Sequence, residues 1–92
     1  MITVEIRKSQ GEYTGFSCSG HAGYAEEGFD IICAAVSVLT VNTINSIEKF
    51  TEDAFKAEAK DGMVRWQFTE LPLSKEAELL MDTLVLGLED IQ

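Results

Sequence analysis

The stretch FKAEAKDGMVRWQF, residues 55–68, decides the fold of this 92-residue chain. Apolar side chains alternate with polar ones on both sides of Asp61-Gly62, which is the period of a half-buried strand. Asp-Gly is a strong hairpin signal, because both central positions of the tightest hairpin turn require a positive φ. The stretch therefore predicts an antiparallel hairpin whose apolar face places Trp66 in the core.

A second alternating pattern precedes this hairpin. Ile2, Val4 and Ile6 alternate with polar residues, a polar stretch at 9–12 indicates a turn, and residues 13–18 form a second strand pattern. These features predict an N-terminal hairpin of the same kind as the later one.

Each predicted hairpin is followed by a helical pattern. Asp30 is expected to cap a first helix from about Ile31 to Phe50, because its carboxylate can accept from the unpaired amides of the first turn. Ser74 is expected to cap a second helix. The predicted core stripe of that second helix is Ala77, Leu80, Met81, Leu84 and Leu88.

The first helix has apolar residues on two sides. One side is predicted to hold Ile32, Val36, Leu39, Ile47 and Phe50, and the nearly opposite side Ala34, Val38 and Val41. Either a sheet and a second helix cover the two sides, or the second side meets a partner subunit. In the second helix, Leu79 and Leu86 lie off the core stripe.

The order of these elements predicts an α+β fold of two ββα units. We expect a four-stranded, mainly antiparallel sheet packed with two helices, on one face or on both as an α/β/α sandwich. Residues 1–92 leave room for one hydrophobic core, so a single domain is expected. The extra apolar helix faces of so small a chain predict a homodimer.

Composition narrows the function. Sixteen acidic and seven basic side chains give a net charge of −9, which repels phosphate backbones and anionic lipid. We therefore expect no nucleic-acid or membrane partner, whereas a basic protein partner is favoured. The N-terminus shows no export signal, and the longest apolar run is too short to span a bilayer, so a cytoplasmic protein is expected.

Gly20–Ser37 is the candidate site. The long, glycine-containing loop 19–29 leads from a strand into the first helix, and loops of that length in small domains are often functional. With Asp30 as the cap, Cys33 falls near the third helical position, where unpaired amides and the helix dipole favour a thiolate. His21 starts the loop that returns to this helix end, so it could activate the sulfur.

The loop also offers space for a substrate. We expect Gly20, Ala22 and Gly28 to let an extended substrate approach the backbone closely. Ser37 lies one turn beyond Cys33 on the same side of the helix and could touch that substrate.

Each of these residues also has an ordinary structural interpretation. A cysteine inside an apolar helical run is commonly inert core, and a lone histidine is commonly a surface loop residue. Asp30 is most simply a cap, and Ser37 a helix-packing residue. Cys18 is expected to pack within its strand. One histidine and two cysteines are too few for a structural zinc site, so no metal is expected.

A resemblance separates these interpretations. Gly20-His21-Ala22, a loop ending in Gly28-x-Asp30, and the run IICAAVS at 31–37 resemble the signature of the bacterial ribosomal-processing cysteine proteases, the Prp family. The likeness covers nearly the whole chain. It implies that Cys33 is the nucleophile and His21 its base, with Asp30 and Ser37 as the matching accessory positions.

The same resemblance implies a function. A homodimeric enzyme without a cofactor would remove a short N-terminal extension from a large-subunit ribosomal protein precursor, by cleavage after a hydrophobic motif. Two alternatives remain at this point. One is a non-catalytic interaction module that binds a basic partner, and the other is a cysteine enzyme with a different acyl substrate, such as a thioesterase.

Overall fold

The computed structural model describes residues 3–20, 27–60 and 63–91, with residues 27–33 described by their backbone alone. The predicted order of two ββα units is confirmed. Ile2 and the Asp61-Gly62 turn lie outside the described residues. The elements are β1 (Thr3–Ser9), β2 (Glu12–Ser19), α1 (Glu27–Phe50), β3 (Phe55–Lys60), β4 (Met63–Phe68) and α2 (Lys75–Asp90).

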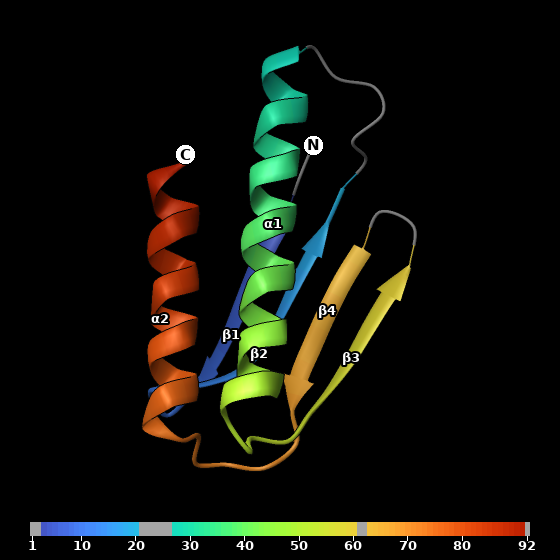
Figure 1. Ribbon diagram of the computed structural model, residues 1–92. Coiled ribbons are helices and arrows are strands. Elements are labelled where there is room, and N and C mark those ends of the chain that lie inside the picture. Colours follow the sequence, from blue (N-terminus) through green and yellow to red (C-terminus); the bar gives the residue numbers. More distant parts are fainter. Residues whose placement is uncertain (1–2, 21–26, 61–62, 92) are drawn as a thin grey trace.

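The four strands form one antiparallel sheet in the order β1-β2-β4-β3. Pairing of β2 with β4 joins the two hairpins, and both helices lie side by side over the same face of the sheet (Figure 1). The α+β fold is therefore confirmed as a two-layer arrangement, and a helix on each face is not what the described chain adopts. Neither helix, over its described residues, is both long and apolar enough to cross a membrane.

The core lies between the sheet and the two helices. Phe16 of β2 and Trp66 of β4 are paired across the strands, and their rings stack with centroids 4.3 Å apart. Ile47 from α1 and Met81 from α2 cover them, and all four side chains are at most 1% exposed. The burial predicted for Trp66 is thus confirmed, and four elements meet at this point.

Helix α1 buries only one of its two apolar sides. Its buried residues recur every three or four positions: Val36, Thr40, Thr43 and Ile47. On the opposite side Val38 is 67% exposed and Val41 46% exposed, so a single chain covers one side alone. The prediction that Phe50 belongs to the buried side is wrong: it is 69% exposed, because it is the last residue of α1.

Helix α2 follows its prediction closely. The Ser74 hydroxyl accepts a hydrogen bond of 3.0 Å from the Ala77 amide, which confirms Ser74 as the N-cap. Leu80 and Leu88 are half-buried, and the other predicted core residues of this helix are buried.

Helix α1 begins at Glu27 rather than at Ile31. Asp30 is therefore the fourth residue of the helix and not its N-cap, and the predicted loop 19–29 is shorter at both ends, because Ser19 belongs to β2. A glycine such as Gly28 costs a helix only about 1 kcal/mol relative to alanine, which does not stop it. An aspartate is favourable anywhere in the first turns, so its presence alone does not locate a cap.

Gly15 of β2 is required by close packing on the open face of the sheet. A Cβ at this position would lie 2.8 Å from Arg7 Nη2 and 2.9 Å from the Trp66 carbonyl oxygen. The second of these atoms belongs to the backbone of the neighbouring strand and moves only if the sheet distorts.

We predict that Gly15→Ala lowers the free energy of unfolding by about 1–3 kcal/mol, the usual cost of forcing extra atoms into a packed site. Urea denaturation at neutral pH measures it. Ser17→Ala, two positions along the same strand face, is the control and should change stability by less than about 0.5 kcal/mol. Equal effects of the two substitutions would contradict the steric argument.

Asp53 joins the end of α1 to the start of α2. Its carboxylate accepts hydrogen bonds from both the backbone amide of Ser74, at 2.8 Å, and the Ser74 hydroxyl. Partial burial tends to raise the pKa of Asp53, but these hydrogen bonds outweigh burial and hold the pKa below its ordinary value. The ionised form of Asp53 therefore stabilises the fold.

We predict that Asp53→Asn lowers the free energy of unfolding by about 1 kcal/mol at neutral pH. Because the folded pKa is depressed, this contribution is fully present above the unfolded pKa of about 3.9 and is lost as the pH falls through the folded value. The difference between wild type and variant should therefore shrink on acidification. Glu52→Gln, at the exposed neighbouring carboxylate, is the control. A difference that grows at low pH would refute the assignment.

Candidate active site

The described residues include most of the predicted site, but not all of it. His21 and Ala22 lie outside them. Gly20 follows β2 directly, and the backbone of Gly28, Asp30 and Cys33 belongs to α1. Ser37 is in the same helix, where its side chain is exposed.

The structure corrects the expected setting of Cys33. Because α1 begins at Glu27, Cys33 is its seventh residue and not its third. Only the first four amides of a helix lack an intrahelical acceptor, and the dipole effect decays within the first turn. The start of α1 therefore does not supply unpaired amides at Cys33, and that part of the thiolate argument is wrong.

The helix face that carries position 33 borders solvent. Positions 33, 37 and 41 stand one turn apart along α1, so they form one line on its surface. Ser37 is exposed and Val41 is 46% exposed, whereas Val36 and Thr40 on the adjacent line are buried. This line thus follows the boundary between the core and the solvent-exposed side of α1.

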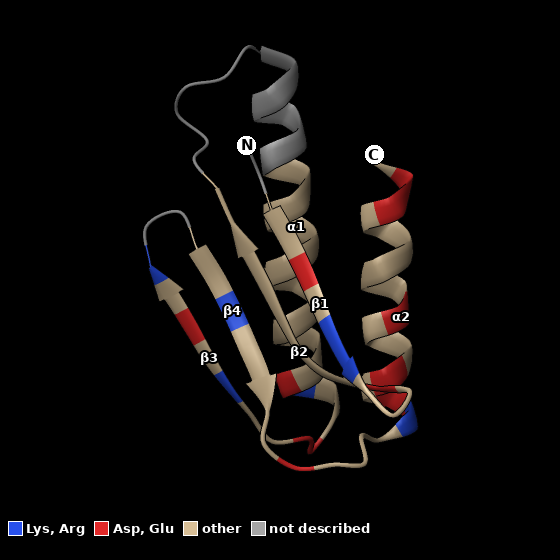
Figure 2. Cartoon of the chain, turned by 180° about the vertical axis from the view of Figure 1, so that it is seen from behind, with Lys and Arg blue, Asp and Glu red and all other residues tan. Residues whose placement is uncertain are grey.

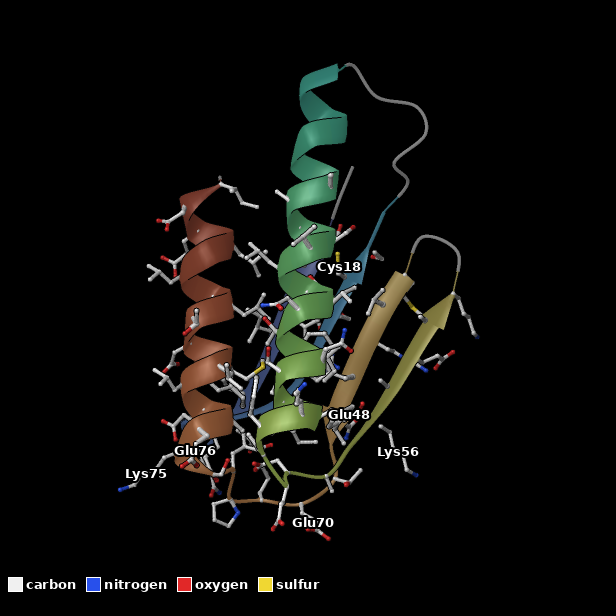
Figure 3. The ribbon with its side chains drawn as sticks, viewed as in Figure 1. Cys18, Glu48, Lys56, Glu70, Lys75 and Glu76 are labelled. Carbon is white, nitrogen blue, oxygen red and sulfur yellow. The ribbon has the colours of Figure 1, made fainter. Side chains whose placement is uncertain are left out.

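The fold brings the two halves of the motif to one end of the molecule. The chain leaves β2 at Gly20 at the same end as that at which α1 begins (Figure 1). Cys18, near the end of β2, is half-buried and packs against the core, as its strand position predicted; Figure 3 shows it beside α1. Gly20 and the start of α1, which undescribed residues separate in the sequence, therefore lie in one region of the molecule.

Two surface hollows lie away from this end. A hollow of about 780 Å³ is on the open face of the sheet, and another of about 490 Å³ lies between the end of α1 and the start of α2. Neither is lined by Gly20 or Ser37. Within residues 3–20, 27–60 and 63–91, no group of three or more His, Cys, Asp or Glu side chains is placed to hold a metal ion.

Comparison with known proteins decides the class of this protein. A profile of the family described as cysteine protease Prp matches residues 1–92. The chain belongs to the cysteine protease Prp family. It is accordingly a cysteine protease, and the alternative of a non-catalytic binding module is set aside.

Relatives in the Prp family match almost end to end. The ribosomal processing cysteine protease Prp of Staphylococcus aureus strain Mu50 is 29% identical, over 100% of this chain and 89% of the relative. A crystal structure of the S. aureus Prp with a substrate peptide superposes with a TM-score of 0.89 at 29% identity, covering 99% of this chain and 88% of the other. A second one, with a covalently linked product peptide, gives 0.84 at 30% identity with the same coverage.

One feature of the surface was not predicted from the sequence. Basic side chains of three strands, including Arg7 and Lys56, line the larger hollow on the side of the sheet away from the helices. Counting alternate positions along each strand would have placed them on one face, but only the register between the strands shows that they gather there.

Proposed function

We propose that this Prp-family protease removes a short N-terminal extension from the precursor of a large-subunit ribosomal protein, with Cys33 as nucleophile and His21 as general base. The observation that carries the proposal is the match of the Prp family profile to residues 1–92. Two features support it: relatives in S. aureus are ribosomal processing proteases, and Ser37 and Val41, the next positions along α1 in line with position 33, are exposed.

The chemistry needs only a thiol, an imidazole and water. His21 takes the proton of Cys33, and the thiolate attacks the peptide carbonyl carbon. Protonated His21 then gives that proton to the leaving amine as the C–N bond breaks. Water hydrolyses the resulting thioester and releases the short extension, and the thiol is regenerated without a cofactor.

The setting of Cys33 within α1 limits what the helix contributes. Because residue 33 lies beyond the first turn, activation of the thiol depends chiefly on His21. Main-chain amides for the oxyanion would come from the loop after Gly20 rather than from the start of the helix.

We assign the remaining motif residues by position. Asp30, inside α1 and one turn before Cys33, would orient His21. Exposed Ser37, one turn after Cys33, would contact the substrate. Gly20, Ala22 and Gly28 would let the substrate backbone pass close to the enzyme.

The charge of the chain supports the choice of substrate. Proteins that bind ribosomal RNA must themselves be basic, and a net charge of −9 attracts such a precursor. A cytoplasmic enzyme that folds as one protease domain over residues 1–92 fits this role.

We predict that Cys33→Ala reduces trimming of the organism's own large-subunit ribosomal protein precursors by at least about a thousandfold. His21→Ala should reduce it by about a hundredfold or more, since it removes the proton acceptor. Mass spectrometry of the precursor over time measures both. Cys18→Ala, at the chain's other cysteine, is the matched control and should retain most activity.

Thiol alkylation tests the pairing of the two residues separately. In the Cys18→Ala background, iodoacetamide reports on Cys33 alone, and His21→Ala should shift its reactivity to higher pH. Trimming that persists in Cys33→Ala would refute the proposal. An unchanged alkylation profile in His21→Ala would remove His21 from the role of base.

We also infer a homodimer that packs through the outward side of the helices. Val38 and Leu86 are 67% and 60% exposed, and they flank the close contact between Leu39 of α1 and Gly87 of α2. Single apolar side chains are common on surfaces, but these two stand on adjacent helices on either side of one interhelical contact. A second copy would cover it.

We predict that Val38→Asp converts a dimer of the 10.2 kDa chain into a monomer in sedimentation velocity. A buried, unpaired carboxylate on both sides of a two-fold interface is strongly unfavourable. Phe50→Asp is the control, because Phe50 is equally exposed but lies at the far end of α1. A wild-type monomer, or a Val38→Asp dimer as tight as wild type, would overturn the inference.

A further inference from the structure

The face of the sheet that no helix covers has a charge opposite to that of the whole chain. Figure 2 shows it from behind, with basic bands on β1, β4 and β3. The strand register places four cations and two carboxylates on this outer face: Arg7, Arg65, Lys56, Lys60, Glu5 and Glu58. Four of the seven basic residues of a chain with net charge −9 thus share one face.

The cations surround a hollow. The space of about 780 Å³ is lined by Arg7, Lys56 and Arg65, together with polar Gln67. Arg7 from β1 lies across β2, where only a glycine leaves room for its guanidinium, since a Cβ at Gly15 would come within 2.8 Å of Nη2. Three strands therefore direct cationic groups toward one place.

Internal pairing leaves this face positive. The Glu58 carboxylate accepts from Lys60 Nζ at 2.8 Å and from Arg65 Nη2 at 2.6 Å, so one anion serves two cations. Hydrogen bonds from these two groups lower the pKa of Glu58, which stays ionised. Glu5 accepts from Arg7 Nη1 at 3.1 Å. Lys56 stands at the outer strand β3 and is exposed (Figure 3).

We propose that this outer sheet face is a docking surface for an acidic segment of a partner protein. On this face the cations alternate with two glutamates. Carboxylates spaced along an acidic segment match that spacing of cations, whereas the uninterrupted charge of a phosphate backbone does not. The aromatic rings of β2 and β4, Phe16, Trp66 and Phe68, are buried on the opposite face, so nucleic-acid bases find no ring there to stack on.

This surface lies on a different face of the molecule from the region to which peptide cleavage is assigned. Helix α1, with Cys33, covers the other face of the sheet, so a partner bound to the outer face leaves α1 uncovered (Figure 1). The surface would hold the enzyme against an acidic partner while the proteolytic site acts on a different segment. The proposal therefore stands whether or not Cys33 has the role assigned above.

The test is a titration of the ¹⁵N-labelled protein with a synthetic decapeptide of alternating Glu and Ser at low ionic strength. Amide shifts should change on β3 and β4, at Lys56 and Gln67 among others. Lys56→Glu should weaken binding about fivefold or more, since one surface attraction becomes a repulsion. Lys75→Glu, the same substitution at an exposed lysine that starts α2, should leave affinity unchanged.

Several outcomes would overturn the docking surface. These are no shift changes on the sheet at low salt, equal weakening by Lys56→Glu and Lys75→Glu, or tighter binding of a ten-nucleotide RNA than of the acidic peptide. The amide spectrum of each free variant reports its folding. If Lys56→Glu alone disturbs that spectrum, Lys56→Gln gives the same comparison without a new charge.

Discussion

The stacking of Phe16 on Trp66 is the contact on which the rest of this structure depends. The two hairpins are separate in the sequence, and this pair of rings, 4.3 Å apart, lies where β2 meets β4 to form one sheet. Because both rings are almost completely buried, the face that carries them must be covered, and both helices pack there. Because successive side chains of a strand point to opposite faces of the sheet, the charged side chains lie on the other face.

This constraint also positions helix α1. Helix α1 is anchored by its buried line, which ends at Ile47 in the core beside the stacked rings. Cys33 lies fourteen residues earlier, which at 1.5 Å per residue is about 21 Å along the same rigid helix. The backbone of residue 33 therefore lies well away from the densest part of the core, at the end where the chain leaves β2.

The two faces of the molecule are suited to different partners. The helix side presents uncovered apolar residues, among them Val38 of α1 and Leu86 of α2. The sheet side presents cations in a chain that is otherwise strongly acidic. An enzyme of 92 residues has little surface to spare, and the proposed docking surface lies on the face of the sheet opposite to the helices.

The sequence by itself determined the order of strands and helices, the hairpins, the cap at Ser74 and the residues of the cysteine protease motif. These follow from local rules: alternation, turn chemistry, capping and spacing act between residues a few positions apart. Only the tertiary structure decided that both helices share one face, that Phe50 is exposed, and that α1 begins at Glu27, which removes Asp30 from the cap and Cys33 from the first turn. The physical reason is that these features depend on contacts between segments that are distant in the sequence, which no local pattern encodes. The features are the burial of a side chain, the residue at which a glycine-containing helix begins, and the clustering of charged residues on one face of a sheet.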